Sequence, residues 1–211
     1  MNTVIIEEKE KIGYLTMNRP AKLNALTDEL LCEMYDGIKT FNADEDIRVI
    51  VIKAAGRAFC AGFDLSPREE PFTTVQDWYE HAQLGNRTMF AIWNSKKPVI
   101  GQIQGHCLGG GCDIAMVCDI TIAGEGAMFG EPEIQFSSMS PFVIMPWVVG
   151  MKRTKELMLT GDQISAVEAE RCGLITRVVP DAQLSREVLS VAKKLIKIPI
   201  PAMKMNKKSI N

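Results

Sequence analysis

The stretch that decides the fold is Val-Ile-Gly-Gln-Ile-Gln-Gly-His-Cys-Leu-Gly-Gly-Gly-Cys-Asp-Ile-Ala-Met-Val-Cys-Asp, residues 99–119. It is typical of a buried strand, a turn of three glycines at 109–111, and a short apolar helix with Asp113 in its first turn. Consecutive glycines between apolar runs indicate that a ligand or another backbone segment comes very close. The first amides of a helix lack partners within it and favour negative charge. The stretch therefore predicts either a turn that offers a free amide to a small oxyanion beside Asp113, or a tight packing turn.

Phosphate-binding patterns do not fit this turn. The spacing after Gly105 does not give G-x-G-x-x-G, and Gly111 stands where a P-loop requires lysine. The G-x-S-x-G motif of serine hydrolases is also absent from the sequence. With these patterns excluded, the feature to be explained is an acid beside a glycine turn.

Length and charge indicate an ordinary globular protein. The 211 residues predict one domain, with 46% hydrophobic and 24% charged residues. Because 24 basic residues oppose 26 acidic ones, we expect neither a nucleic acid nor a membrane as partner. Residues 1–8 are too acidic for a targeting peptide, and no apolar run is long enough to span a bilayer.

The cysteines predict a reduced, cytoplasmic protein. Six of them are scattered through the chain without a C-x-x-C pair, and the two histidines complete no zinc pattern. Cysteines inside apolar runs are typical of reduced core residues. We therefore expect neither a disulfide framework nor a metal site.

The order of elements predicts an α/β domain. In the first half we expect a hairpin at 4–17, an ordered loop at 18–26, a helix capped by Thr27, and a buried strand at Val49–Ile52. Residues 66–74 are typical of a loop, and Thr74 with Asp77 predicts the capped start of a helix that reaches Trp93.

The second half continues the alternation of strands and helices. After the central stretch we expect a strand at Ile120–Ala123 and a helix at Lys155–Thr160 that stops at Gly161. Ser165 and Glu168 predict a capping box for a helix ending at Gly173. A strand at Leu174–Val179 and a helix at Ser185–Ile198 follow. Such alternation is typical of a parallel sheet with right-handed crossovers.

Five motifs in this order resemble the crotonase, or enoyl-CoA hydratase/isomerase, family. They are Asn18-Arg19-Pro20 with Leu23-Asn24-Ala25-Leu26, the segment Phe59-Cys60-Ala61-Gly62-Phe63-Asp64-Leu65, the segment Gly105 to Asp113, Phe129-Gly130-Glu131-Pro132-Glu133, and Leu159-Thr160-Gly161-Asp162 with Ala169 and Gly173-Leu174-Ile175. The resemblance implies a crotonase-like spiral of ββα units. It also implies acyl-CoA thioester substrates and a homotrimer or a dimer of trimers.

The same resemblance implies a domain division and a role for the chain's end. Residues 1–198 are expected to form the acyl-CoA-binding core, and 199–211 to begin the C-terminal helical region used in trimerisation. That region is expected to be incomplete, because family members continue beyond the position of Asn211. Lys204, Lys207 and Lys208 are expected to form a solvated cationic face.

Specific site residues follow from the matched positions. The resemblance implies an oxyanion hole made by the backbone amides of Phe63 and Gly110. Two such donors would stabilise the negative charge that develops on a thioester carbonyl oxygen. It also implies a pair of catalytic carboxylates, Asp113 and Glu133, separated by 20 residues. In the expected assignment, Asp113 orients or deprotonates the water that adds to Cβ, and Glu133 delivers a proton to Cα.

Substrate contacts are expected along the first two motifs. The residues expected to bind substrate or coenzyme A are Lys22, Leu23, Ala25, Ala61, Gly62, Asp64, Leu65, Gly109 and Pro132. Arg57 and Lys22 are candidates for phosphate contacts. Met139, Phe142, Met145 and Trp147 are expected either to shape an acyl pocket or to pack in the core. No cofactor is expected, since coenzyme A is part of the substrate.

Two departures from the family pattern keep the activity open. Asp113 stands where hydratases carry glutamate, and its side chain is one methylene shorter. Pro141 stands where dienoyl-CoA isomerases carry a further aspartate. We therefore expect an enoyl-CoA hydratase, with an enoyl-CoA isomerase and a non-catalytic acyl-CoA or partner-binding protein as the alternatives.

Overall fold

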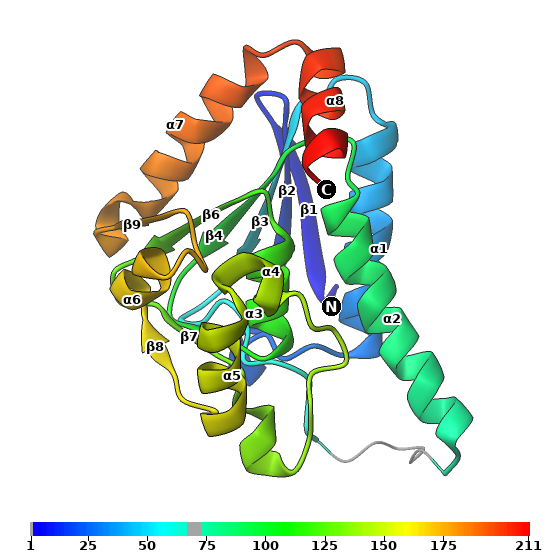
Figure 1. Ribbon diagram of the computed structural model, residues 1–211. Helices are drawn as coiled ribbons and strands as arrows, with labels where there is room; N and C mark the ends of the chain where they lie inside the picture. The colour runs from blue at the N-terminus through cyan, green and yellow to red at the C-terminus, as the bar shows by residue number, and fades with distance from the viewer. Residues whose placement is uncertain (1, 67–72) are drawn as a thin grey trace.

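The computed structural model describes residues 2–66 and 73–211, and a six-stranded sheet forms its centre (Figure 1). The strand order is β1-β2-β3-β4-β6-β9. These strands are β1 (Val4–Lys9), β2 (Ile12–Met17), β3 (Val49–Ala54), β4 (Val99–Ile103), β6 (Ile120–Gly124) and β9 (Arg177–Val179). Within the described part of this sheet only the β1–β2 pair is antiparallel, which confirms the expected hairpin and α/β class.

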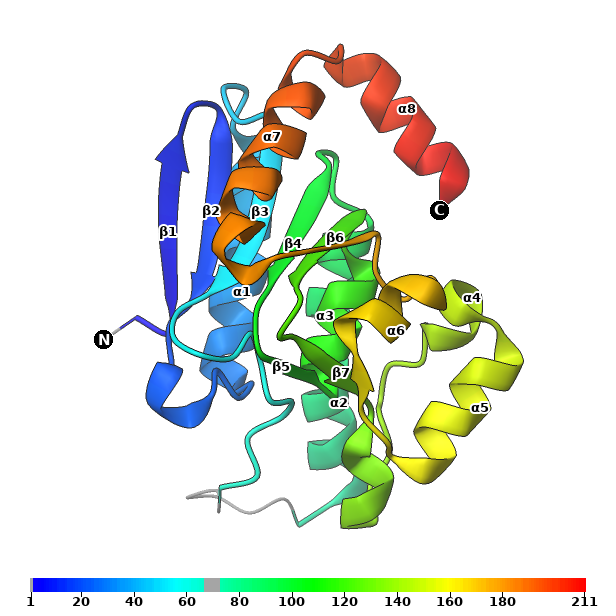
Figure 2. The same ribbon diagram turned by 90° about the vertical axis from the view of Figure 1, so that its left-hand side faces the viewer.

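Alternating side chains of β3 supply both faces of this sheet. Val49 and Val51 pack with α7 (Leu184–Ile196), whereas Ile50 and Ile52 belong to the larger core on the other face. That larger core is built from α1 (Asp28–Ala43), α2 (Val75–Trp93) and α3 (Gly110–Val117). Figure 2 shows α7 across one face and these helices on the other. The continuous apolar run at 49–52 reflects burial on both faces.

A second, three-stranded sheet carries the segment after β4. Its strands are β5 (His106–Leu108), β7 (Met128–Gly130) and β8 (Ile164–Ser165). The sequence predicts one strand from Val99 to Leu108, which is wrong in this respect. Gly105 bends the chain with a φ of +57°, and a Cβ there would overlap the carbonyl oxygen of Arg57. The bend moves β5 out of the first sheet and beside β7.

Capping residues start the long helices where the sequence predicts. The Thr27 hydroxyl accepts the Leu30 amide at the start of α1. Thr74 and Asp77 form a complete capping box at α2. At α6 (Ala166–Arg171), Ser165 accepts the Glu168 amide, but the Glu168 carboxylate pairs with Arg153 and Arg171. The reciprocal half of that predicted capping box is therefore absent.

Several predicted boundaries shift. The helix predicted at Lys155–Thr160 is α5 (Met151–Thr160), which begins four residues earlier and still ends at Gly161, with a φ of +70°. The strand predicted at Leu174–Val179 is reduced to β9. Residues 67–72 of the predicted loop lie outside the described residues. The remaining elements are α4 (Met145–Val149) and the short 3₁₀ helices η1 (Pro20–Lys22), η2 (Pro132–Phe136) and η3 (Asp181–Gln183).

The chain ends in a helix after Pro199, α8 (Ile200–Ile210). The expectation of a solvated cationic face is wrong for Lys207, whose side chain is 11% exposed. Its Nζ lies 2.7 Å from Oδ2 of Asp119 and also donates to the carbonyls of Ile92 and Lys97. Among the described residues, no helix is long and apolar enough to cross a bilayer.

Candidate active site

The site begins with a segment held between two backbone neighbours. Residues 60–64 run between Leu26 and β5, joined by bridges from Phe63 to Leu26 and from Cys60 to Cys107. The Leu26 amide donates to the Gly62 carbonyl (2.8 Å), and the Asp64 amide donates to the Leu26 carbonyl (2.9 Å). In this parallel pattern, the amide of Phe63 points away from Leu26.

Two backbone amides remain without an acceptor in this region. In residues 2–66 and 73–211, neither the Phe63 amide nor the Gly110 amide donates to a backbone carbonyl. Gly110 is the first residue of α3, so its amide has no partner within the helix. The Phe63 ring lies over Gly110, because a Cβ on Gly110 would be 2.9 Å from Cε2 of Phe63. The two amide-bearing residues are thus neighbours.

The glycine turn allows a close approach of three segments. Gly109 has a φ of +52°, and its Cα faces both Gly62 and the carboxylate of Glu133. A Cβ on Gly109 would lie 3.5 Å from Cα of Gly62 and would overlap Oε1 of Glu133. The Gly109 amide donates to the Gly130 carbonyl of β7 (2.9 Å). The turn is therefore tightly packed and also leaves the next amide free.

A cavity of about 620 Å³ opens over this turn. Of the residues expected to form the site, those that line the cavity are Ala61, Gly62, Phe63, Asp64, Leu65, Gly109, Pro132 and Glu133. Those that do not line it are Lys22, Leu23, Ala25, Gly110 and Asp113. Met139 also lines it, whereas Phe142 and Met145 are core residues and Trp147 is 81% exposed.

The sequence interpretation missed part of the wall. The additional lining residues are Ser66, His81, Ala82, Phe136, Ser138 and Pro141. His81 packs edge-on against Phe63 at 5.6 Å between ring centroids, and its Nδ1 lies 2.8 Å from Oδ1 of Asp28. The helical spacing places His81 on α2, but only the tertiary fold brings α2 beside the glycine turn.

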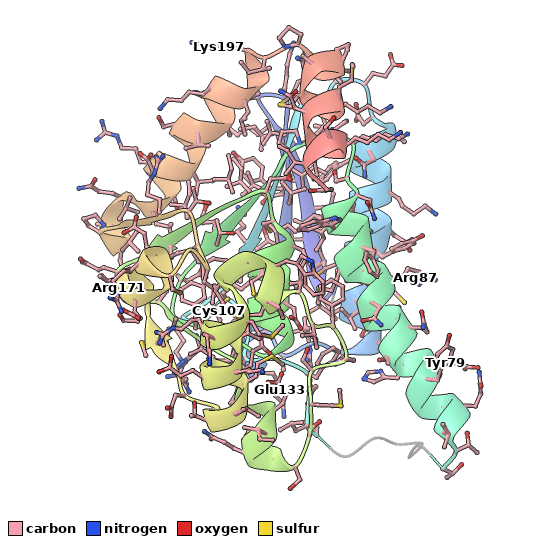
Figure 3. All side chains as sticks on the ribbon, in the orientation of Figure 1. Tyr79, Arg87, Cys107, Glu133, Arg171 and Lys197 are labelled. Atoms are coloured by element: carbon pink, nitrogen blue, oxygen red, sulfur yellow. The ribbon has the colours of Figure 1, made fainter. Side chains whose placement is uncertain are left out.

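Glu133 is the carboxylate that reaches the cavity. It lies in the first turn of η2, directly after Pro132, and is half-buried (labelled in Figure 3). Burial raises the pKa of Glu133, while its own amide and the carboxyl of Glu131 lower it. The net shift is upward, as is suitable for a group that exchanges protons near neutral pH.

Asp113 lies behind this wall. It is 2% exposed, and its Oδ2 is 3.0 Å from Oγ of Ser140. The Ser140 hydroxyl also lies 2.8 Å from the Phe142 carbonyl oxygen. Burial raises the pKa of Asp113 well above its usual value, the Ser140 hydroxyl lowers it, and the charge of Glu133 raises it further. The protonation states of Asp113 and Glu133 are therefore coupled, although only Glu133 faces the cavity.

An ion pair between Arg19 and Asp64 lies at the edge of the cavity. Arg19 Nη2 lies 2.8 Å from Oδ2 of Asp64, and Arg19 Nη1 donates to the Ala25 carbonyl. Hydrogen bonds from Ser66, together with Arg19, hold the pKa of Asp64 at about 2 despite the opposing effect of partial burial. Asp64 therefore stays ionised and fixes the loop at 18–26 to the segment that carries the Phe63 amide.

This arrangement suits an acyl group whose carbonyl oxygen gains negative charge. Two free amides at a helix start and a bridge lie beside a carboxylate with a raised pKa, all on backbone fixed by hydrogen bonds. Within the described residues, no group of three or more His, Cys, Asp or Glu is arranged to hold a metal ion. The fold and site together define an α/β protein in which a half-buried carboxylate with a raised pKa lines a cavity beside a glycine turn.

Comparison with known proteins identifies the family. A sequence profile described as enoyl-CoA hydratase/isomerase matches residues 7–211. The chain is 38% identical to a probable enoyl-CoA hydratase of Rhizobium meliloti (99% of this chain, 81% of the relative) and 36% identical to a short-chain-enoyl-CoA hydratase of Clostridium acetobutylicum (100% and 82%). An enoyl-CoA hydratase/isomerase structure from Xanthobacter autotrophicus Py2 superposes with a TM-score of 0.96 at 34% identity (99% and 78%). The chain belongs to the enoyl-CoA hydratase/isomerase family.

Proposed function

We propose that the protein hydrates 2-enoyl-CoA thioesters to 3-hydroxyacyl-CoA. The observation that carries the proposal is the pair of free amides, at Phe63 and Gly110, beside the cavity-facing carboxylate of Glu133. Membership of the family and the hydratase relatives support the same reaction. An acyl thioester would enter the 620 Å³ cavity with its carbonyl oxygen toward the two amides.

The chemistry proceeds through negative charge on the thioester oxygen. The two amides stabilise this charge as a water oxygen bonds to Cβ and the C=C electrons shift toward the carbonyl. Glu133 takes a proton from the water and gives a proton to Cα, so the carboxylate is regenerated and water is added overall. Preorganised donors of this kind contribute roughly 10²–10³ in rate each.

We assign Asp113 to a supporting role in this scheme. Because it is 2% exposed and its carboxylate lies 3.0 Å from the Ser140 hydroxyl, we assign direct contact with substrate to Glu133, which lines the cavity. The charge of Asp113, which depends on its protonation state, alters the pKa of Glu133. This division differs from the sequence expectation, in which Asp113 activates the water. Asp113→Asn separates the two assignments: activation of water by Asp113 predicts loss of hydration, whereas a supporting role predicts a shifted pH profile with turnover retained.

Enoyl-CoA isomerisation is the second candidate function. It requires one carboxylate that moves a proton between Cα and Cγ, and only one of the two expected catalytic carboxylates lines the cavity. The third candidate, a non-catalytic acyl-CoA-binding or partner-binding protein, predicts that no turnover accompanies acyl-CoA binding.

We further propose how substrate and subunits are arranged. Coenzyme A lies along the loop with Lys22, Leu23 and Ala25 and along 61–65, with exposed Arg57 and Lys22 near its phosphates. The reaction uses no other cofactor. The chain assembles as a homotrimer or a dimer of trimers, as the family resemblance implies.

One assay pair tests the function. Hydration is followed as loss of enoyl absorbance with crotonyl-CoA, and isomerisation as its gain with a 3-enoyl-CoA. We expect hydration to dominate and Glu133→Gln to abolish it. Glu45→Gln is the matched control, because Glu45 is an exposed carboxylate outside the site. Full turnover by Glu133→Gln would contradict the assigned site, and dominant isomerisation would favour the second candidate.

A further inference from the structure

Glu131 is a buried acid that the proposed reaction does not use. It stands between β7 and η2, two residues before Glu133, and is 3% exposed. In the ionised state, neither of its carboxylate oxygens accepts a hydrogen bond from an N–H or O–H donor among the described residues. A buried carboxylate without such donors is costly, so this position demands an explanation.

The groups that face Glu131 are acidic or neutral. They are the thiol of Cys112 and the carboxyl of Asp113 from α3, the thiol of Cys107 from β5, and the carboxyl of Glu133 from η2. In the part of the chain that the structure describes, Glu131, Asp113 and Glu133 take part in no ion pair. Burial, with no neighbouring cation to oppose it, raises the pKa of all three carboxyls, so the cluster favours retaining protons.

Burial favours the protonated form of Glu131 over that of Glu133. Burial, then the charges of Asp113 and Glu133, raise the pKa of Glu131 well above its usual value. Glu133 is the more exposed of the two glutamates and faces the cavity. A protonated Glu131 has one O–H to donate, and the neighbouring Glu133 carboxylate is its acceptor, since Oε2 of Glu133 has no hydrogen-bond partner among the described residues. This contact gives the Glu131 O–H an acceptor and the Glu133 carboxylate a charge-assisted hydrogen bond.

We propose that Glu131 is a positioning residue that, in its neutral form, donates a hydrogen bond to the Glu133 carboxylate and fixes its orientation and charge for proton transfer. The proposal rests on the proposed function of Glu133. Pro132 joins the two residues and fixes its own φ at the start of η2, which limits how far the two carboxyls can separate. We place Glu131 out of contact with the substrate, because it is 3% exposed.

Two substitutions separate hydrogen bonding from packing. Glu131→Gln keeps a neutral donor of the same size, and Glu131→Met keeps the volume without a donor. Thr154→Val is the control for losing a buried polar group, because Thr154 is 4% exposed and bonds only the Gly150 carbonyl in the described chain. Folding of each variant is checked by circular dichroism.

For Glu131→Met we expect kcat to fall about 10- to 100-fold and the acidic limb of the kcat–pH profile to move about one to two units upward, as loss of a charge-assisted hydrogen bond predicts. Glu131→Gln should restore both to within a few fold of the parent chain. An unchanged kcat–pH profile for Glu131→Met would show that Glu131 contributes only packing. A Glu131→Gln profile that matches that of Glu131→Met would overturn the neutral-donor assignment.

A direct titration keeps this result independent of turnover. Carboxyl ¹³C chemical shifts of labelled glutamate, with the Glu133 signal assigned from Glu133→Gln, report the pKa of Glu133 in each folded variant. We expect the pKa to rise in Glu131→Met and not in Glu131→Gln. If the parent chain turns over neither enoyl-CoA, the proposed function fails, whereas the titration still supports or overturns the contact between Glu131 and Glu133.

Discussion

Gly109 has no Cβ, and this leaves room for the Glu133 carboxylate. The residue has a φ of +52°, and a Cβ added to it would overlap Oε1 of Glu133 and lie 3.5 Å from Cα of Gly62. Any larger side chain must therefore adopt a strained backbone and displace the reacting group. At this scale, the geometry of the site depends on one glycine at least as much as on the acids.

Gly109→Ala should lower kcat/KM for crotonyl-CoA by about 10²-fold or more, because a shift of about 1 Å at a reacting group has that effect. Gly150→Ala is the matched control, since Gly150 has a φ of +79° with nothing within 4 Å of a Cβ. It should share the backbone strain, measured as a lower urea midpoint, and keep turnover. Equal activity of the two variants would contradict the assigned role of Gly109.

Glu131 should make stability depend on pH. Its pKa is raised on folding from the ordinary value of 4.5, so the folded chain keeps a proton that the unfolded chain loses above about that pH. The unfolded state then binds fewer protons, and the free energy of unfolding falls as pH rises through this window. Glu131→Gln removes this dependence.

The unfolding free energy of Glu131→Gln relative to the parent should therefore increase by up to about 1.4 kcal/mol per pH unit as the pH rises above 4.5 toward the raised pKa of Glu131 in the folded chain. Urea unfolding at several pH values, followed by tryptophan fluorescence, measures the difference. The exposed Glu45→Gln should show a constant difference. A constant difference for Glu131→Gln as well would mean that Glu131 gains no proton on folding.

Sequence could supply part of this residue-level picture. The motif spacing named Glu133 and the segment of Phe63, and the structure brings both to one cavity. The motif spacing did not single out Glu131, because an acid between glycine and proline is typical of an ordinary loop. Its importance depends on the burial that Cys107, Cys112 and Asp113 impose from other elements. Such long-range burial is not encoded in local spacing.

Elements were predictable where local chemistry defines them. The caps at Thr27 and Thr74 and the positive-φ glycine at 161 mark helix ends through neighbouring residues alone. The separation of β4 from β5 was not predictable, since it depends on pairing of β5 with β7, which lies more than 20 residues further along the chain. The tertiary contacts of α8 were missed for the same reason.

Lys207 should hold α8 against the body of the protein. Its Nζ bonds Asp119, whose other partner is the Val99 amide at the start of β4. Lys207→Met leaves the Asp119 carboxylate, whose side chain is 24% exposed, without its cation, at a cost of about 1 kcal/mol. We expect faster proteolysis within 199–211 and a lower melting temperature.

Lys204→Met is the control, because Lys204 is exposed on the same helix. It should leave both the cleavage rate and the melting temperature near those of the parent chain. Equal protease resistance of Lys207→Met and Lys204→Met would show that apolar contacts, and not the ion pair, hold α8 in place.

For the molecule as a whole, one region exposes many large apolar side chains. The segment from η2 to the end of α5 contributes Ile134, Phe136, Met139, Val143, Trp147, Met151 and Leu159, each at least 43% exposed. Monomeric proteins rarely leave large apolar surfaces in contact with water, so such a region is typical of a subunit interface. The segment also contributes Phe136, Ser138 and Met139 to the cavity wall. In the proposed trimer, an interface on this segment would link assembly to the site through the same stretch of chain.

The proposed trimer predicts a solution mass of three or six times that of one chain, measured by light scattering after gel filtration. Trp147→Glu should reduce this mass, because a charge at an 81% exposed indole would be buried at an interface. Val75→Glu is the control, since Val75 is 86% exposed at the start of α2, outside this segment. If the cavity wall depends on assembly, KM for crotonyl-CoA should rise with Trp147→Glu and not with Val75→Glu. A monomeric parent chain with full turnover would contradict both the trimer and its link to the site.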